Sequence, residues 1–255
     1  RLPVRVQGML VTDSEGRQCV WSMVQDIRDE QRLGRMQREF VSTVSHELRT
    51  PLTSISGALG LINGGVLGEI PDPAREMVVL ALQNSQQLTF LVNDLLDMEK
   101  LLAGKMTFDL QVQRLLPLVE RVLAGIRGYA EQHQVTCVLR SASDAWVNVD
   151  AQRLEQVLNN LLSNAAKFSP PGAEVEVLIE RQDAWVRVRV RDRGPGIAEA
   201  FRSRIFEQFA QADSSDTREK GGTGMGLAIS RQLMERMEGR IGFDSLEGQG
   251  STFYF

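Results

Sequence analysis

Cysteine and histidine are scarce in this sequence of 255 residues, and their scarcity excludes several kinds of site. The two cysteines, Cys19 and Cys137, are far apart in the sequence and lie in apolar surroundings. We therefore expect buried thiols rather than a disulfide framework or a metal site. With only two histidines, His46 and His133, a histidine-rich metal centre is not expected either.

Basic charge and long apolar runs are also missing. A net charge of -4 provides no basic field for nucleic acid and no polybasic patch for a membrane surface. No apolar run approaches the roughly 18 residues that span a bilayer, and the start RLPVRVQG lacks the layout of a signal peptide. We expect a cytoplasmic chain without nucleic-acid or membrane contacts, which could be the soluble part of a longer, membrane-attached protein.

The first hundred residues change from a strand pattern to a helix pattern. Residues 3 to 25 predict a β-hairpin, because two β-rich runs flank the turn signal TDSEGR. From about Ile27 onward the apolar residues recur mostly at steps of three and four, which predicts a long helix. After the glycines and prolines of NGGVLGEIPDP, a second helix is expected from about Met77 to Leu102.

Each predicted helix carries a narrow apolar seam. The first seam contains Leu33, Met36, Phe40, Val44, Leu48, Leu52, Ile55, Leu59 and Ile62, and the second contains Met77, Leu80, Asn84, Leu88, Leu91, Leu95, Met98 and Leu102. The short loop makes the two helices antiparallel neighbours, and two helices alone do not shield both seams from water. We therefore expect a homodimer in which two hairpins form a four-helix bundle.

After Gly104 the sequence alternates between strand-like and helix-like segments. Apolar β-like runs occur at KMTFDLQV, VTCVLR, AWVNVD, VEVLIER, AWVRVRVRD and STFYF, between helical stretches near 115 to 132, 151 to 168 and 223 to 238. This order predicts an α/β sandwich with one layer of helices. The fold class is therefore a multidomain α+β protein, a helical hairpin followed by an α/β sandwich.

One residue of the first helix points to chemistry rather than packing. At 100° per residue, His46 falls nearly opposite the seam, so it faces solvent. Glu47 can accept a hydrogen bond from one imidazole nitrogen, which leaves the other as a nucleophile. Pro51 removes the helical bond to the carbonyl of residue 47 and predicts a bend there. The alternative, a surface histidine without a task, is weakened by these neighbours.

The second half of the chain contains the elements of a phosphate pocket. Asn160 and Asn164 lie one turn apart on the polar face of a predicted helix, where their amide oxygens can hold a hydrated Mg²⁺. Asp192 begins the turn DRGPGI, in which an aspartate can accept from an amino group. The segment GGTGMGLAIS places glycines ahead of a helix N-terminus, which suits phosphate oxygens. Each signal alone is weak, and a solvated polar face remains the alternative for the asparagines.

The order of these segments resembles that of the sensor histidine kinases of two-component systems. The segment SHELRTPL resembles the phospho-acceptor box of that family, NNLLSNAAKF the asparagine box, DRGPGI the first glycine box and FEQF the phenylalanine box. GGTGMGLAI and GQGSTF are similar to its later glycine boxes. The resemblance covers residues 30 to 255. It implies a dimerisation and phosphotransfer hairpin over 30–105 and an ATP-binding domain of the Bergerat type over 106–255.

Residues 1–29 resemble the end of a PAS sensor domain and its linker, and QDIRDEQ is similar to the motif that joins PAS to a signalling helix. The loop around residues 63 to 73 sets which way phosphoryl passes within a dimer of such hairpins. The resemblance also implies a response-regulator receiver domain as partner.

The resemblance assigns a role to each matching residue. It implies that His46 is phosphorylated, that Glu47 is its base, and that Thr50 positions water in a phosphatase reaction on the response regulator. Asn164 would ligate Mg²⁺, with Asn160 as a catalytic residue at the phosphates. The expected ATP-binding set is completed by Lys167, Phe168, Asp192, Gly194, Gly196, Ile197, Phe206, Phe209, Arg218, Gly222, Thr223, Gly224, Met225, Gly226, Leu227 and Thr252.

Two other classes of function share parts of this pattern. ATPases of the gyrase, Hsp90 and MutL kind are similar in their ATP fold, but they place a glutamate base one turn before the metal-binding asparagine. Here that position is Asn160, an amide that takes no proton at neutral pH. A non-catalytic scaffold would keep the fold without chemistry, and the intact His46, Asn164 and glycine set argue against it.

Overall fold

The structure is a computed structural model that describes residues 3–12, 14, 16–66, 68–211 and 223–255. For residues 29–43, 45 and 46 it describes the helical backbone alone. The chain divides into two compact units, Arg1–Glu99 and Lys100–Phe255.

The first unit begins with the predicted hairpin. Strands β1 (Val4–Thr12) and β2 (Gln18–Asp26) pair antiparallel, and each of their residues is exposed. Cys19 lies on β2 and is exposed, so the expectation of a buried thiol is wrong there, because a two-stranded ribbon has no second layer to cover it. Cys137 is half-buried in the second unit, and burial raises the pKa of its thiol.

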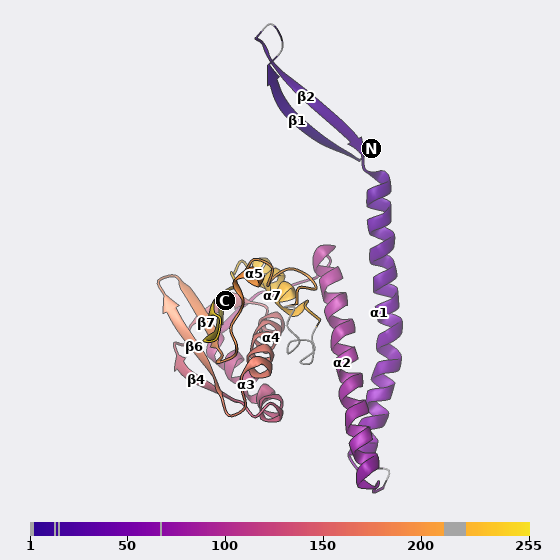
Figure 1. The fold of residues 1–255 in the computed structure, drawn as a ribbon, viewed down its shortest axis with the longest axis vertical. Coiled ribbons are helices and arrows are strands. Elements are labelled where there is room, and N and C mark those ends of the chain that lie inside the picture. The colour runs from indigo at the N-terminus through magenta and orange to yellow at the C-terminus, as the bar shows by residue number, and fades with distance from the viewer. Residues whose placement is uncertain (1–2, 13, 15, 67, 212–222) are drawn as a thin grey trace. The chain divides into compact units, whose positions relative to one another are not determined.

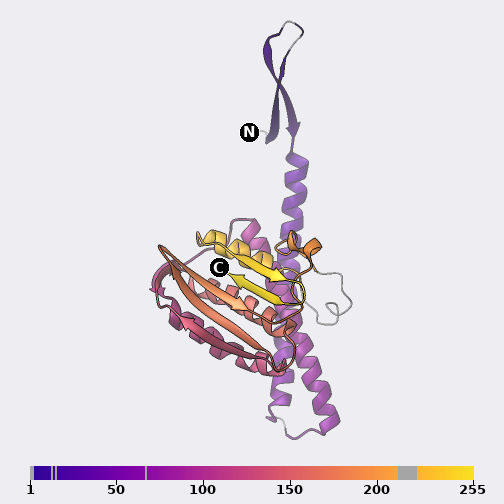
Figure 2. The same cartoon turned by 60° about the vertical axis from the view of Figure 1, so that its left-hand side comes forward.

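Two long helices follow, as the seams predict. Helix α1 (Arg28–Asn63) continues through Pro51, and α2 (Asp72–Leu102) lies beside it (Figures 1 and 2). Polar contacts join them at two levels. The Arg49 guanidinium donates to Asn93 Oδ1 at 2.7 and 3.1 Å, and the hydroxyls of Ser56 and Ser85 lie 2.7 Å apart. None of the described helices is long and apolar enough to cross a membrane.

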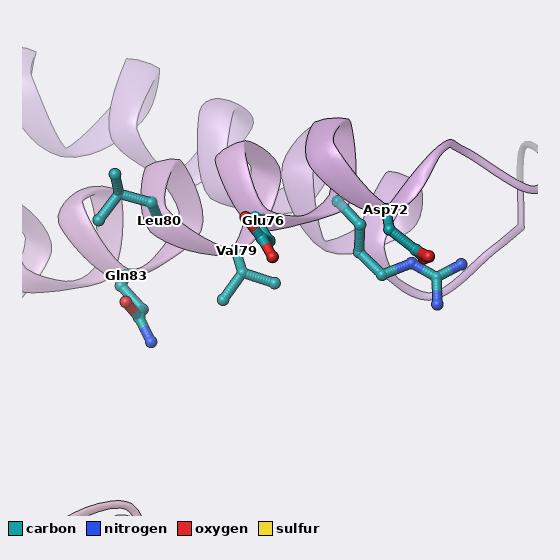
Figure 3. A pocket seen from close by; sticks show the side chains of 6 residues that line it. Asp72, Glu76, Val79, Leu80 and Gln83 are labelled. Carbon is teal, nitrogen blue, oxygen red and sulfur yellow. The ribbon is translucent and has the colours of Figure 1, made fainter.

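The single hairpin leaves much of both seams exposed to solvent. The exposed apolar side chains include Val44, Leu48, Ile55, Met77, Leu80 and Leu88. A surface hollow along the first turns of α2 is lined by Asp72, Arg75, Glu76, Val79, Leu80 and Gln83 (Figure 3). Because all six side chains belong to one helix, this hollow is an open groove rather than an enclosed cavity.

The second unit is the predicted sandwich of one sheet and one helical layer. The sheet order is β4 (Thr136–Ala142), β6 (Glu174–Gln182), β7 (Trp185–Arg191), β9 (Gly250–Tyr254) and β8 (Gly242–Leu246). β4 pairs parallel with β6, and the other pairs are antiparallel. Helices α3 (Leu115–Gln132), α4 (Ala151–Phe168) and α7 (Gly226–Arg236) cover one face, as Figure 2 shows. Strands β3 (Gln111–Arg114) and β5 (Trp146–Val149) pair antiparallel and form a separate two-stranded sheet. Helix α5 (Glu199–Arg202) consists of a single turn.

The core lies between this sheet and α4. Val157 and Leu162 on α4 and Val175, Val177 and Ile179 on β6 are fully buried. The opposite face of the sheet carries charges, such as the ion pairs Arg189–Glu180 at 3.2 Å and Arg191–Glu176 at 3.7 Å. The alternation of buried and charged residues along β6 and β7 follows from the period of two in a strand.

Candidate functional site

The polar face of α4 carries the predicted asparagines. The Asp150 carboxylate caps the helix by accepting from Arg153 N at 3.1 Å, and the buried leucines set its rotation. On the face that they leave free, Asn164 Nδ2 donates to Asn160 Oδ1 at 3.4 Å, and Asn160 Nδ2 donates to Ser230 Oγ at 2.9 Å. The asparagines are therefore joined to each other and to α7.

Asp192 lies at the end of β7 with a buried carboxylate. Its Oδ1 accepts from Gly194 N at 2.8 Å and from Ser251 N at 3.1 Å. Burial raises the pKa of the carboxyl, and the two backbone hydrogen bonds oppose this shift. Since Oδ1 takes both backbone donors, Oδ2 is the oxygen available to accept from a ligand.

Two glycines allow the turn after β7 and the start of α7 to approach α4. A Cβ at Gly194 would lie 2.9 Å from the carbonyl oxygen of Phe168, at the end of α4. A Cβ at Gly226 would lie 2.3 Å from Asn160 Oδ1. Side chains at these positions would force the segments apart. The structure therefore brings the asparagine box, the first glycine box and the later glycine box to one place.

The two phenylalanines of FEQF have different environments. Phe206 packs 6.0 Å from the ring of Phe243, and the Arg231 guanidinium lies 6.0 Å from the Phe206 ring. Phe209 is 63% exposed and has a φ of 59°, which is uncommon for a residue with a side chain. Phe206 is therefore held by contacts with β8 and α7, whereas Phe209 is exposed.

The other predicted residues that the structure describes lie around this site. Ile197 N donates to Ser245 Oγ at 2.9 Å, and Met225 N donates to Thr223 Oγ1 at 3.0 Å. Lys167 Nζ lies 4.9 Å from the centre of the Phe168 ring. Gly196 packs against the backbone of β8, and Gly224 packs against Phe209 and Ala210. Leu227 and Thr252 are partly exposed. Arg218 and Gly222 lie outside the described residues.

The residues predicted for the phospho-acceptor site belong to the first unit. The backbone at His46 is helical, and its side chain lies outside the described residues. Glu47 and Thr50 are exposed on α1. Arg49 lies between them and contacts α2 through Asn93. Glu47 and Thr50 are therefore accessible from solvent.

The donor set at α4 fits a hard divalent cation. Mg²⁺ prefers oxygen ligands, retains waters and binds through few protein groups together with phosphates. Because Asn164 Nδ2 is directed at Asn160, the oxygen of the same amide is turned away from Asn160 and is the candidate ligand. In the described part of the chain, no group of three His, Cys, Asp or Glu residues could hold a metal ion.

Sequence reasoning missed several residues that shape the site. Ser230, Ser245 and Ser251 are buried and hydrogen-bonded to Asn160, to Ile197 and to Asp192 respectively. A small polar residue inside an apolar helix, as in GLAIS, is a usable signal for Ser230, because buried hydroxyls need partners. The sequence contains no comparable signal for Ser245, because the segment that forms strand β8 has no strand pattern that would predict its burial.

Comparisons with known proteins agree with this arrangement. Residues 36–104 match the family described as His Kinase A (phospho-acceptor) domain. Residues 149–255 match the family described as Histidine kinase-, DNA gyrase B-, and HSP90-like ATPase. The chain therefore belongs to the sensor histidine kinases, and it contains the phospho-acceptor and ATP-binding domains of that family.

Individual relatives support the same family. The chain is 31% identical over 238 residues to sensor protein SrrB of Staphylococcus aureus, which covers 93% of this chain and 41% of that protein. The crystal structure of full-length ShkA in complex with AMPPNP has a TM-score of 0.67 at 32% identity, covering 85% of this chain and 45% of that one. The Acinetobacter baumannii histidine kinase AdeS has a TM-score of 0.58 at 26% identity, covering 82% and 96%. The chain thus spans about two fifths of the length of the curated relatives it matches.

The burial of Asp192 predicts how stability depends on pH. Asp192→Asn keeps an oxygen for both backbone donors and removes a buried charge. Because burial raises the pKa of Asp192 in the folded state, the stability linked to this shift is present below the unfolded-state value of 3.8 and is lost as pH rises through the folded-state value. We expect the melting temperature of Asp192→Asn to equal or exceed that of wild type at pH 7, with a smaller difference near pH 4.

Calorimetric melts of both proteins between pH 4 and pH 7 measure this difference. If Asp192→Asn lost more stability relative to wild type at pH 7 than at pH 4, the raised pKa of Asp192 would be contradicted. That result would mean that the negative charge of Asp192 stabilises the fold.

Proposed function

We propose that this chain is the kinase portion of a sensor histidine kinase, which phosphorylates His46 from ATP and passes the phosphoryl group to an aspartate of a response-regulator receiver domain. One observation carries the proposal. Asn160, Asn164, Asp192 and Gly226 are gathered at one place in the second unit, on a chain whose first unit carries His46 on a long helical hairpin.

The contacts support distinct roles for the pocket residues. Asp192 Oδ2 accepts from the adenine amino group, because Oδ1 is held by two backbone donors. Asn164 offers an oxygen to Mg²⁺, and Lys167 and Asn160 lie near the phosphates. When bound, Mg²⁺ neutralises charge that develops on the β- and γ-phosphate oxygens. Among the described residues no side chain caps the start of α7, so the backbone N–H groups of its first turn are available to the same phosphates.

The transfer step uses the exposed helix face. The free imidazole nitrogen of His46 attacks the γ-phosphorus, the bond to the β,γ-bridging oxygen breaks, and ADP leaves with that oxygen. The imidazole proton passes to Glu47, which acts as the base. Direct hydrolysis in the manner of gyrase is disfavoured, since the amide of Asn160 occupies the position of the base.

Further proposals concern the assembly and boundaries. We assign residues 30–105 to dimerisation and phosphotransfer, 106–255 to ATP binding, and 1–29 to the end of a PAS-like sensor domain. The exposed ribbon β1–β2 supports the last assignment, because a lone hairpin is marginally stable and its apolar side chains need further strands. The kinase portion works in the cytoplasm, where ATP is available.

The phosphorylation site can be tested with the two histidines of the chain. We expect His46→Gln to lose autophosphorylation from labelled ATP and Mg²⁺ while nucleotide affinity stays within about twofold, because acceptor and pocket lie in separate units. The matched control, His133→Gln, should keep the label. Label that is stable in base and labile in acid identifies phosphohistidine, and label retained by His46→Gln would refute the assignment.

The exposed seam predicts a homodimer. Leu88 is 48% exposed on α2, and Leu88→Glu would place a carboxylate in the interface between two hairpins. An unpaired buried charge should raise the dimer dissociation constant by about a hundredfold. The control Val66→Glu changes an apolar residue of the loop that is 70% exposed. Sedimentation equilibrium measures both constants, and equal constants would place the interface elsewhere.

A phosphatase activity is proposed for Thr50. The Thr53 hydroxyl donates to the carbonyl of Arg49 at 2.9 Å, whereas Thr50 is exposed one turn from His46. We expect Thr50→Ala to slow decay of a phosphorylated regulator about tenfold or more, because it misplaces the attacking water, and to retain autophosphorylation. Thr53→Ala is the control and should leave both rates unchanged. Equal decay with wild type and Thr50→Ala would leave a kinase without this phosphatase role.

A further inference from the structure

A buried serine on α7 contacts the polar face of α4. Ser230 is 1% exposed, and its Oγ accepts from Asn160 Nδ2 at 2.9 Å. Its neighbours Ala228, Ile229 and Leu233 are buried and apolar. A hydroxyl in such surroundings is costly unless it is hydrogen-bonded. Ser230 is therefore placed to affect the site through Asn160.

The start of α7 favours one orientation of the Asn160 amide. Gly226 lies one turn before Ser230, and the Asn160 Oδ1 atom occupies the space that a side chain at Gly226 would fill. The N–H groups in the first turn of a helix carry partial positive charge, which favours an oxygen beside them. This charge favours the amide orientation with Asn160 Oδ1 beside Gly226 and Asn160 Nδ2 beside Ser230. The hydrogen bond from Asn160 Nδ2 to Ser230 Oγ has this orientation.

The orientation of Asn160 decides which atom Asn164 presents. Asn164 Nδ2 donates to Asn160 Oδ1, so the oxygen of the Asn164 amide is turned away from Asn160. If the Asn160 amide turned over, its nitrogen would face Asn164, and Asn164 would satisfy it by turning its own oxygen inward. A divalent cation needs that oxygen on the outer side.

We propose that Ser230 is a positioning residue for the metal ligand Asn164, acting through the amide of Asn160. This inference rests on the proposed function, because it requires nucleotide and Mg²⁺ at α4. In this arrangement the Ser230 hydroxyl touches neither of them. The Ser230 hydroxyl orients the amide of Asn160, and the amide of Asn160 in turn orients the amide of Asn164.

Threonine and valine provide a matched pair of substitutions at this position. Ser230→Thr and Ser230→Val add nearly the same volume to a buried site, and only the threonine keeps a hydroxyl. The 255-residue chain is titrated with AMPPNP in a calorimeter, first with EDTA and then at increasing Mg²⁺. Thermal melts of each variant accompany the titrations, and Ser230→Ala, which adds no volume, is included in case the larger side chains prevent folding.

We expect the metal-free affinity for AMPPNP to stay within about twofold in every variant. Ser230→Val and Ser230→Ala should need about three- to tenfold more Mg²⁺ to reach the same affinity gain, in line with the loss of one hydrogen bond, while Ser230→Thr stays near wild type. Equal Mg²⁺ requirements in Ser230→Thr and Ser230→Val, or in Ser230→Ala and wild type, would overturn the inference and leave the proposed function intact. Wild type that binds no AMPPNP would overturn the proposed function, and the inference with it.

Discussion

The nucleotide half of the structure depends on one buried oxygen atom, Asp192 Oδ1. It accepts from the backbone of Gly194 and of Ser251, and the Asp192 N–H donates to the Ser251 carbonyl at 2.8 Å. These bonds join the end of β7, the turn that follows it and the start of β9. The carboxylate thus links the turn after β7 to the start of β9, and it fixes the position of the turn that packs against α4. The same burial that orders the turn disfavours its charge, and the two backbone donors offset part of this cost.

Helix α4 carries Asn160 and Asn164 on one face and packs its other face into the core. Leu158, Leu161 and Leu162 are buried against the rest of the unit, and they leave little freedom for the helix to rotate about its axis. A shift of one residue would turn Asn160 by 100° away from α7. The positions of the amides are therefore set by hydrophobic packing on the opposite side of the helix, and the polar contact to Ser230 adds only the final orientation.

Most of the fold could be predicted from periodicity, and part of the site could not. The segments that form α1, α2, β6 and β7 have clear apolar periods, and the structure contains these helices and strands. Strand β8 was missed because GFDSL has only Phe243 and Leu246 as apolar residues, and its pairing with β9 depends on tertiary contacts. The segment GLAIS signals a buried hydroxyl at Ser230, but its partner Asn160 depends on the packing of α7 against α4, which no local pattern encodes. The exposure of Cys19 was predicted wrongly, because an apolar strand suggests a covering layer that the described chain does not supply.

The exposed seam of the helical hairpin has a consequence for how the protein responds to its own abundance. For a dimer built on side chains such as Met77 and Leu80, the folded bundle and the association of two chains are one equilibrium, so stability varies with protomer concentration. Each tenfold dilution removes about 1.4 kcal/mol from the balance that favours the pair. For such a dimer, the number of copies in the cell sets the fraction of chains that are paired. In a cell that makes few copies, a smaller fraction of the chains forms four-helix bundles.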